Sequence, residues 1–404
     1  MPPRPPGRTV FRGGSVFDGT GSQPTRADVA IEGETIREVG LDLAGDHVID
    51  VAGSTVMPGL IDCHAHPAFP GAASTLDDDV ERSPTFVAYE ALAGLRATLD
   101  AGVTTVRDAA GADAGIRRAV AEGLIPGPRL LISLIQLSPS AGPYDGRSPS
   151  GFDTWIPRPG IPSPVADGAD ELRTKVRELA QAGADVVKIF ASGHFAMPRD
   201  GALRSMFTDA ELAAIVDEAN HQGIRVMAHA HGPVPAAAAA RAGVASIEHG
   251  FFLDDVALTA MRDAGTVFVP TLLASAGVLE AFEGTSAERA EATVRAHRAA
   301  VRAAHAMGIT IALGTDCPVT PHGRNAEELQ LLVECGLSPW EALAAGTSVA
   351  ARLLDLDAEI GRVTPGHRAD LLVVRGDLAD VSFFRSRLEG VYQGGVRVGP
   401  TAPP

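Results

Sequence analysis

The amino-acid sequence predicts an α/β protein: a (β/α)₈ (TIM) barrel with a small discontinuous β-sandwich domain. From Pro58 onward, helical stretches that end in glycine alternate with short apolar, β-branched runs. This alternation is typical of a parallel sheet covered by helices. Eight such units over roughly 300 residues fit a barrel better than a doubly wound sheet. The open sheet is the weaker alternative, because no Gly-x-Gly-x-x-Gly turn follows the first strand.

The first 57 residues contain short β-type runs separated by Gly, Asp and Pro turn signals, which indicate a small all-β unit. Similar runs return near the other end of the chain, after a helix predicted over 339–354. Because chain ends commonly lie close together, we expect residues 1–57 and 360–404 to form one β-sandwich domain beside a barrel of residues 58–359. The β segments predicted for this domain are 9–11, 15–17, 28–32, 35–39, 47–51, 360–363, 369–374 and 390–398.

Each predicted barrel strand after the first follows a glycine that closes the preceding helix. Glycine suits this position because it adopts the left-handed conformation without strain. The glycines are Gly102, Gly123, Gly183, Gly223, Gly243, Gly265 and Gly308.

Residues 137–168 interrupt this pattern after the third predicted strand. The stretch contains seven prolines and little periodicity, and it holds Tyr144, Phe152 and Trp155 in a chain that is only 5% aromatic. Structureless loops beyond about 12–15 residues are usually active-site lids or linkers. Its place after a strand of the barrel favours a lid that covers the substrate.

The composition excludes several classes of partner. The chain of 404 residues has a formal net charge of −16 and no Lys/Arg tract, which argues against nucleic acid and anionic membranes. Three cysteines are too few for a disulfide framework. Residues 1–10 lack the apolar core of a signal peptide, and no run of about 18 apolar residues suggests a membrane span. We therefore expect a cytoplasmic homo-oligomer that acts on a small molecule.

Two histidines one residue apart, His64 and His66, end the first predicted barrel strand. On a strand, side chains two residues apart point to the same face, with Cα atoms about 6.6 Å apart. Such a pair can bind one metal ion, each with a nitrogen at about 2.0–2.1 Å. Two polar residues at a strand end are the plainer interpretation of the pair alone.

Other metal-binding side chains follow other predicted strands, where a barrel gathers its catalytic residues. Lysine is rarely buried without a partner, so a lysine inside an apolar run needs an explanation. A buried salt bridge is one. Beside several histidines and an aspartate, a neutral amine that reacts with CO₂ to form a carbamate ligand is the better one. The side chains are Lys188 on strand four, His229 and His231 on strand five, Glu248 and His249 on strand six, and Thr315 and Asp316 after strand eight.

In this order and spacing, the motifs MPGLIDCHAH, DVVKIFASG, MAHAHG, IEHG, GTD and GRVTPGHRADLLVVRGD resemble the amidohydrolase superfamily. The resemblance is to the subgroup containing imidazolonepropionase, Xaa-Pro dipeptidases and ochratoxinase, and it covers nearly the whole chain. It implies two divalent metal ions, with zinc the best match and manganese or cobalt as alternatives. It assigns His64, His66 and Asp316 to one ion, His229 and His249 to the other, and carboxylated Lys188 to both.

The same resemblance implies a metal-dependent amidohydrolase that cleaves an amide-type C–N bond with a metal-bridging hydroxide. A dipeptide or an N-acyl amino acid is the expected substrate. Asp316 would move the proton, with His231 facing the substrate. The alternatives are hydrolysis of a cyclic amide, carbamate or urea, a mononuclear deaminase, and a non-catalytic scaffold. Lys188 argues against the deaminase, and the complete ligand set argues against the scaffold.

One departure from the family pattern affects the substrate. Relatives often carry Gly-Gly-His-Gly after strand three, whereas residues 140–146 here contain no histidine. Tyr144 is the candidate to donate the equivalent hydrogen bond. Trp155 of the lid and the loop histidines His194 and His322 are further candidates for substrate contact. The remaining histidines are expected at solvent-facing positions: His47, His221, His297, His305 and His367.

Overall fold

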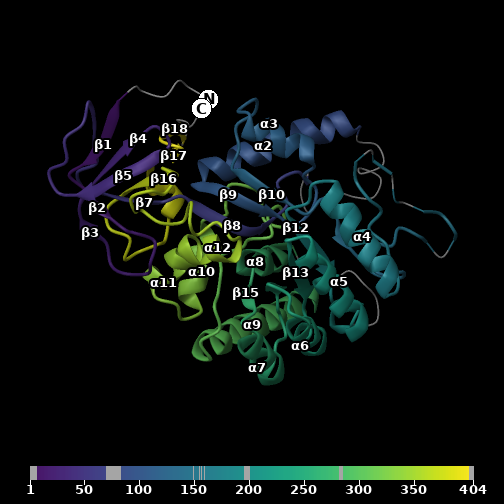
Figure 1. The fold of residues 1–404 in the computed structure, drawn as a ribbon. Helices are drawn as coiled ribbons and strands as arrows, with labels where there is room; N and C mark the ends of the chain where they lie inside the picture. The colour runs from purple at the N-terminus through teal and green to yellow at the C-terminus, as the bar shows by residue number, and fades with distance from the viewer. Residues whose placement is uncertain are drawn as a thin grey trace.

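The structure is a computed structural model, which describes residues 7–69, 83–148, 150–153, 155, 157–158, 160–194, 201–281 and 285–399. Strands of the two chain ends lie side by side at one end of the molecule (Figure 1). The alternating strands and helices of the central part form the rest, so the protein is of the α/β class.

The terminal strands form two sheets that share a hydrophobic cluster. One sheet has the order β5-β4-β1-β6, and the other has the order β18-β17-β16-β7-β2-β3. The second sheet joins both chain ends, because Val373 of β16 pairs with Val56 of β7. Phe11 and Ile31 of the first sheet pack with Val373 of the second in the shared cluster. The strands are β1 Arg8–Arg12, β2 Ser15–Val16, β3 Thr25–Arg26, β4 Asp28–Glu32, β5 Thr35–Gly40, β6 His47–Asp50, β7 Ser54–Pro58, β16 Leu371–Arg375, β17 Leu388–Gln393 and β18 Val396–Gly399.

Two predictions for the C-terminal part are wrong. Residues 360–363 form a bend instead of a strand, with Gly361 at a φ of 83° and the Val363 N–H donating to the Asp18 carbonyl at 3.1 Å. The helix predicted over 339–354 is two helices, α11 Pro339–Ala345 and α12 Ser348–Leu353. The break falls at Gly346, whose carbonyl accepts a hydrogen bond from the Ile61 N–H at 2.8 Å instead of continuing a helix.

The central strands are all paired in parallel, in a three-stranded sheet of order β10-β9-β8 and a five-stranded sheet of order β11-β12-β13-β14-β15. The Asp185 N–H donates to the Ile132 carbonyl at 2.7 Å and so connects the two sheets on one side. The strands are β8 Leu60–Ala65, β9 Val103–Asp108, β10 Arg129–Ile132, β11 Gln136–Leu137, β12 Val186–Phe190, β13 Arg225–Ala230, β14 Ser246–His249 and β15 Val267–Val269.

The eighth predicted strand, residues 309–316, is present only as an isolated bridge between Ile311 and Phe268. It nevertheless hydrogen-bonds to both neighbouring strands. The Ala312 N–H donates to the Phe268 carbonyl of β15 at 2.9 Å, and the Cys63 N–H of β8 donates to the Leu313 carbonyl at 2.9 Å. The segment does not form a regular ladder, and the pairing of β8 with β9 also shifts register after Asp62. The segment therefore lies between β15 and β8.

The helices that follow the strands end as the sequence predicts where glycine closes them. Gly243 and Gly265 adopt left-handed φ angles of 93° and 69° at the ends of α6 and α7. Leu95, Leu258 and Leu329 of three different helices belong to the main hydrophobic cluster. The helices are α2 Pro84–Asp100, α3 Ala114–Ala121, α4 Ala169–Gln181, α5 Asp209–His221, α6 Pro233–Ala242, α7 Asp255–Ala264, α8 Leu272–Ala281, α9 Thr285–Ala306 and α10 Glu327–Glu334, with short 3₁₀ turns η1 Gly201–Leu203 and η2 Phe384–Arg387.

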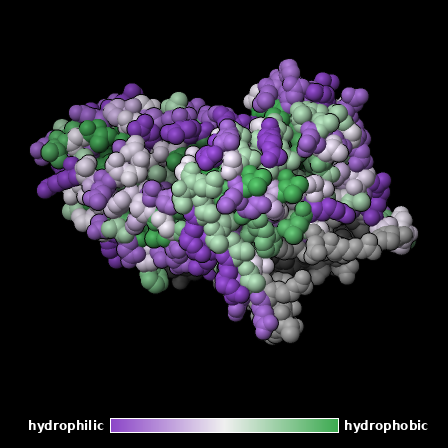
Figure 2. All heavy atoms as spheres, turned by 90° about the horizontal axis from the view of Figure 1, so that it is seen from below, coloured by the Kyte–Doolittle hydropathy of each residue, from purple (hydrophilic) through white to green (hydrophobic). Residues whose placement is uncertain are grey.

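The ends of the Pro-rich stretch 137–168 lie side by side, because the Ser138 N–H donates to the Pro164 carbonyl at 2.9 Å. Hydrophilic and hydrophobic residues are mixed on the face of the molecule seen from below (Figure 2). Among the described residues, none of the helices combines the length and the apolar character that a membrane span requires.

Candidate functional site

Side chains from four of the predicted barrel strands meet at one point. Nε2 of His64 lies 3.3 Å from Nζ of Lys188 and 3.3 Å from Oδ1 of Asp316. Nε2 of His66 lies 3.1 Å from the same Asp316 oxygen, and Nδ1 of His249 lies 3.9 Å from Oδ2. One ligand atom each from His64, His249 and Asp316 lie within 4.8 Å of one another. The strand ends thus bring together residues that are far apart in the sequence.

His229 and His231 complete this group. The His229 ring lies 4.6 Å from the His249 ring and 4.4 Å from the His231 ring, measured between centroids. Nε2 of His229 lies 3.1 Å from the Gly193 carbonyl, which leaves Nδ1 for another partner. All four histidines predicted as metal ligands, together with His231, are buried.

Burial sets the charge of these groups. It lowers the pKa of His229 and of His249 well below the ordinary value, and it lowers the pKa of His231 to about 3. It also lowers the pKa of Lys188 to about 8, against the opposing effect of Glu248 and Asp316. A histidine must be neutral to bind a metal ion, and a carbamate forms only on a neutral amine. Burial therefore favours neutral His229, His231 and His249, and it brings the neutral form of Lys188 closer to physiological pH.

Asp316 is held in its charged form. Burial would raise the pKa of its carboxyl, but hydrogen bonds with His64 and His66 hold that pKa well below its ordinary range. Its backbone has a φ of 58°, and the neighbouring Thr315 hydroxyl donates to Asp62 at 2.7 Å. The Asn325 amide donates to the same Asp62 oxygen at 2.9 Å. Sequence reasoning missed this support, which fixes the backbone beside Asp316.

Sequence reasoning also missed a buried ion pair behind His64. Oε2 of Glu248 lies 2.6 Å from Nδ1 of His64, and Oε1 accepts a hydrogen bond from Arg107 at 3.0 Å. Arg107 lies inside the apolar run VTTVRD, so the reasoning that singled out Lys188 applies to it equally.

The donor set fits divalent metal ions. Neutral imidazoles and a carboxylate are ligands that zinc prefers, and each of the two His64 nitrogens faces a carboxylate oxygen. Nδ1 faces Glu248, whereas Nε2 faces Asp316. His66 repeats this arrangement, with Nδ1 at 3.0 Å from the Ala110 carbonyl.

A model of the amidohydrolase family matches residues 55–397. The chain belongs to the amidohydrolase family. This confirms the resemblance that the motifs indicated and makes the chain a hydrolase of that family. Its strand-end histidines, Lys188 and Asp316 all lie within the matched region.

Similar proteins cover nearly the whole amidohydrolase chain. Ochratoxinase from Aspergillus niger is 31% identical over an alignment of 424 positions. The alignment covers 96% of this chain and 86% of ochratoxinase. A Xaa-Pro dipeptidase with methionine bound in its active site is 28% identical, with a TM-score of 0.88 over 97% of this chain and 100% of the dipeptidase. A prolidase complexed with N-methylphosphonate-L-proline is 33% identical, with a TM-score of 0.87 over 98% of this chain and 100% of the prolidase.

Aromatic rings line one side of the histidine group in this amidohydrolase. The Tyr144 ring stacks on Phe190 at 5.5 Å, and Phe190 lies 4.6 Å from the His229 ring. The Tyr144 hydroxyl accepts a hydrogen bond from Gln136 at 3.3 Å. The structure therefore places Tyr144 one ring away from a predicted metal ligand.

The structure also describes the other candidate substrate contacts. His194 is half-buried, with its ring 6.3 Å from that of Phe190. Burial lowers the pKa of His322 to about 4, and its ring lies against Gly94 of α2. Trp155 is half-buried and packs against the main hydrophobic cluster, so its contact with a substrate stays a prediction.

The prediction that His297 faces solvent is wrong. Its side chain is fully buried, and its ring stacks on Phe251 at 4.2 Å, which in turn lies 4.6 Å from the His231 ring. A signal was present in the sequence, because Val294, His297 and Val301 share one face of α9. His297 thus lies behind the histidine group without joining it.

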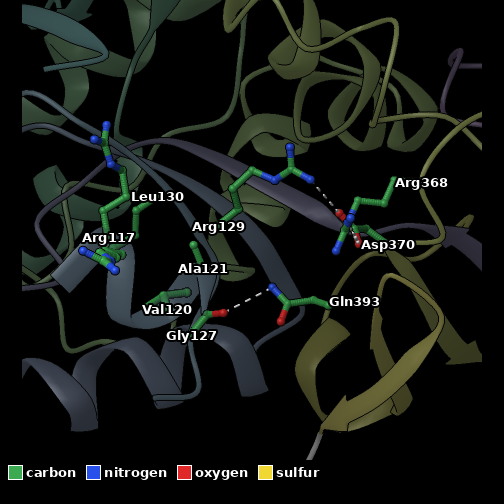
Figure 3. A pocket seen from close by; sticks show the side chains of 10 residues that line it. Arg117, Val120, Ala121, Gly127, Arg129, Leu130, Arg368, Asp370 and Gln393 are labelled. Carbon is green, nitrogen blue, oxygen red and sulfur yellow. Dashed lines mark hydrogen bonds and ion pairs between the residues drawn. The ribbon is translucent and has the colours of Figure 1, made fainter. Parts of the chain in front are cut away.

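A cavity of about 360 Å³ lies at the opposite ends of the strands (Figure 3). Arg129 begins β10, whereas the predicted ligands lie at the ends of their strands. Two arginines that line the cavity are paired with carboxylates: Arg129 with Asp370 at 3.9 Å, and Arg117 with Asp185 at 2.6 Å. The lining residues are Arg117, Arg118, Val120, Ala121, Gly127, Arg129, Leu130, Arg368, Asp370 and Gln393. The cavity contains none of the predicted site residues.

Proposed function

We propose that this amidohydrolase is a metal-dependent hydrolase that cleaves an amide-type C–N bond in a dipeptide or an N-acyl amino acid. The observation that carries the proposal is the convergence of His64, His249 and Asp316, with Lys188 at 3.3 Å from His64. The similar proteins support the substrate class, since they include an ochratoxinase, a Xaa-Pro dipeptidase and a prolidase.

Two divalent metal ions, with zinc the best match, would occupy this site. His64, His66 and Asp316 would hold one ion, His229 and His249 the other, and carboxylated Lys188 would bind both. When bound, such ions polarise a carbonyl and lower the pKa of water to about 7. The low pKa of the His229 and His249 imidazoles supports this assignment, because neutral rings bind metals.

The protein's own groups would bind the substrate and move the proton. Asp316 would accept a proton from the attacking water at a carboxylate oxygen and deliver it to the departing nitrogen. Tyr144 would donate a hydrogen bond to the substrate, which its stacking on Phe190 beside the histidine group supports. His231 would contact the substrate next to His229.

We also propose that the two parallel sheets and residues 309–316 form one closed (β/α)₈ barrel. In this proposal residues 58–359 are the barrel, residues 1–57 and 360–404 are a β-sandwich domain, and residues 137–168 are a lid. The hydrogen bonds of Ala312 and Leu313 to both neighbouring strands support closure. We propose further that the protein is a homo-oligomer and acts on a small molecule. Light scattering of the purified protein would test the oligomeric state.

The deciding experiment is an activity screen of the purified, metal-reconstituted protein. Its substrates are Xaa-Pro dipeptides, N-acyl amino acids, lactams, carbamates and ureas. Hydrolysis of the first two classes that stops with a chelator and returns with zinc is the expected result. Hydrolysis that persists in metal-free protein would contradict metal dependence, and preference for lactams, carbamates or ureas would contradict the substrate class. The variant His64→Asn is the control for a contaminating hydrolase.

A further inference from the structure

Arg107 of β9 is a fully buried cation in the interior of the protein. Its Nε donates to the Cys63 carbonyl of β8 at 2.6 Å, and its Nη1 donates to the Ser246 hydroxyl of β14 at 3.0 Å. Its Nη2 donates to Glu248 at 3.0 Å. A buried charge is costly unless it is paired and its hydrogen bonds are satisfied. The guanidinium therefore connects the two strands that carry His64 and His249.

Glu248 transmits this connection to a predicted metal ligand. Its Oε1 accepts hydrogen bonds from Arg107 and from the Ser246 hydroxyl, and its Oε2 lies 2.6 Å from Nδ1 of His64. A carboxylate only accepts hydrogen bonds, and this contact is shorter than the 3.3 Å between Nε2 and Oδ1 of Asp316, so the proton of a neutral His64 lies on Nδ1. Nε2 then points toward Lys188 and Asp316, where the metal site is proposed.

His66 provides a contrast within the same chain segment. Its Nδ1 faces the Ala110 carbonyl, a neutral acceptor in a loop, whereas that of His64 faces a carboxylate fixed by a buried arginine. Partners of this kind fix both the tautomer and the ring orientation of a metal-binding histidine. The ion pair thus constrains His64 from the opposite side of the interior.

We propose that Arg107 and Glu248 are positioning residues for His64. They hold its ring so that the Nδ1–H donates to Glu248 and Nε2 is directed at the metal site. The consequence for metal binding rests on the proposed function, whereas the tautomer of His64 does not. Arg107 acts through Glu248, and neither residue needs to touch the substrate.

The experiment compares Glu248→Gln, Arg107→Met and the double variant Arg107→Met/Glu248→Leu with the wild-type protein. Each should lose about 10–100-fold in zinc affinity at one site, measured by competition with a chelator. The double variant removes both charges and so leaves no unpaired buried charge. If it folds without metal, its loss of zinc affinity is due to lost positioning and not to lost stability. Asp370→Asn is the matched control, since Asp370 is a buried carboxylate paired with Arg368 just before β16. Its zinc affinity should not change.

A second measurement uses metal-free protein labelled with ¹⁵N-histidine, with the His64 signal assigned by its absence in His64→Asn. The wild-type His64 should carry its proton on Nδ1, and the double variant should lose this preference. Wild-type His64 protonated on Nε2 alone, or folded variants with unchanged zinc affinity, would overturn the proposal. If the wild-type protein binds no zinc, the proposed function fails and the tautomer measurement still decides the proposal.

Discussion

Nζ of Lys188 lies 3.3 Å from Nε2 of His64, although the two residues are separated by 124 positions in the sequence. Lysine in such a place needs a chemical reason, because burial lowers its pKa to about 8 and makes a neutral amine accessible near physiological pH. Carboxylation by CO₂ would convert this amine into an oxygen ligand.

The first prediction is that Lys188→Ala loses most of its bound metal. The wild-type protein should contain about two divalent ions per chain, as expected for a two-metal hydrolase. Elemental analysis of both purified proteins measures the difference. Lys175→Ala is the control, because Lys175 pairs with Glu178 on α4 at 2.6 Å. Full metal content and normal activity in Lys188→Ala would show that Lys188 does not bridge the ions.

The second prediction concerns the stability of the metal-free protein in CO₂-free buffer. The pKa of Lys188 is about 8 in the folded protein, against an ordinary value of 10.5. Between these values the unfolded chain binds more protons at this residue, so the free energy of unfolding rises with pH. The rise due to Lys188 should be about 3 kcal/mol in all.

Urea unfolding of wild-type and Lys188→Met protein between pH 8 and 10.5 isolates this contribution. The difference between their unfolding free energies should change in favour of the wild-type protein as the pH rises. A constant difference across this range would mean that Lys188 titrates normally in the folded state.

The third prediction concerns residues 137–168, the proposed lid. Tyr144→Phe should lower kcat if the hydroxyl polarises the substrate carbonyl, whereas Trp155→Ala should mainly raise KM. Phe152→Ala is the control, because Phe152 is 75% exposed. Steady-state kinetics on a good substrate measures all three variants. Unchanged constants for Tyr144→Phe and Trp155→Ala would leave the lid without a catalytic role.

The sequence predicted the alternating elements and the grouping of His64, Lys188 and Asp316, because strand ends of a parallel sheet share an edge. It could not predict which carboxylate pairs with which cation across the interior. Arg107 and Glu248 are 141 positions apart, and no local pattern connects them. Burial of His297 was readable in principle, but the alanines around it obscured the apolar face of α9.

Other differences arise from tertiary hydrogen bonds that override local preference. The helix predicted over 339–354 breaks because the Gly346 carbonyl accepts from the Ile61 N–H. Residues 309–316 form only an isolated bridge to Phe268 and are held by hydrogen bonds to β15 and β8. Both contacts join residues that lie far apart in the sequence, so only the folded chain shows them.

The last prediction concerns Asp316, whose Oδ1 lies 3.1 Å from Nε2 of His66 and 3.3 Å from Nε2 of His64. If Asp316 only bound metal, Asp316→Asn would weaken metal affinity and excess metal would restore the rate. If it also moves the proton, asparagine cannot replace it, because an amide has no basic site near neutral pH. General acid–base catalysis contributes about 10²–10⁴-fold, so metal-saturated Asp316→Asn should lose at least that in kcat.

The substrate provides an internal control for this variant. A good leaving group needs less protonation of the departing atom, so the loss in kcat should be smaller for such a substrate. Measuring both substrates at saturating metal separates proton transfer from metal binding, since a defect in metal binding would affect them equally. A metal-saturated Asp316→Asn protein that cleaves an ordinary amide at nearly the wild-type rate would show that Asp316 is a ligand and not the proton shuttle.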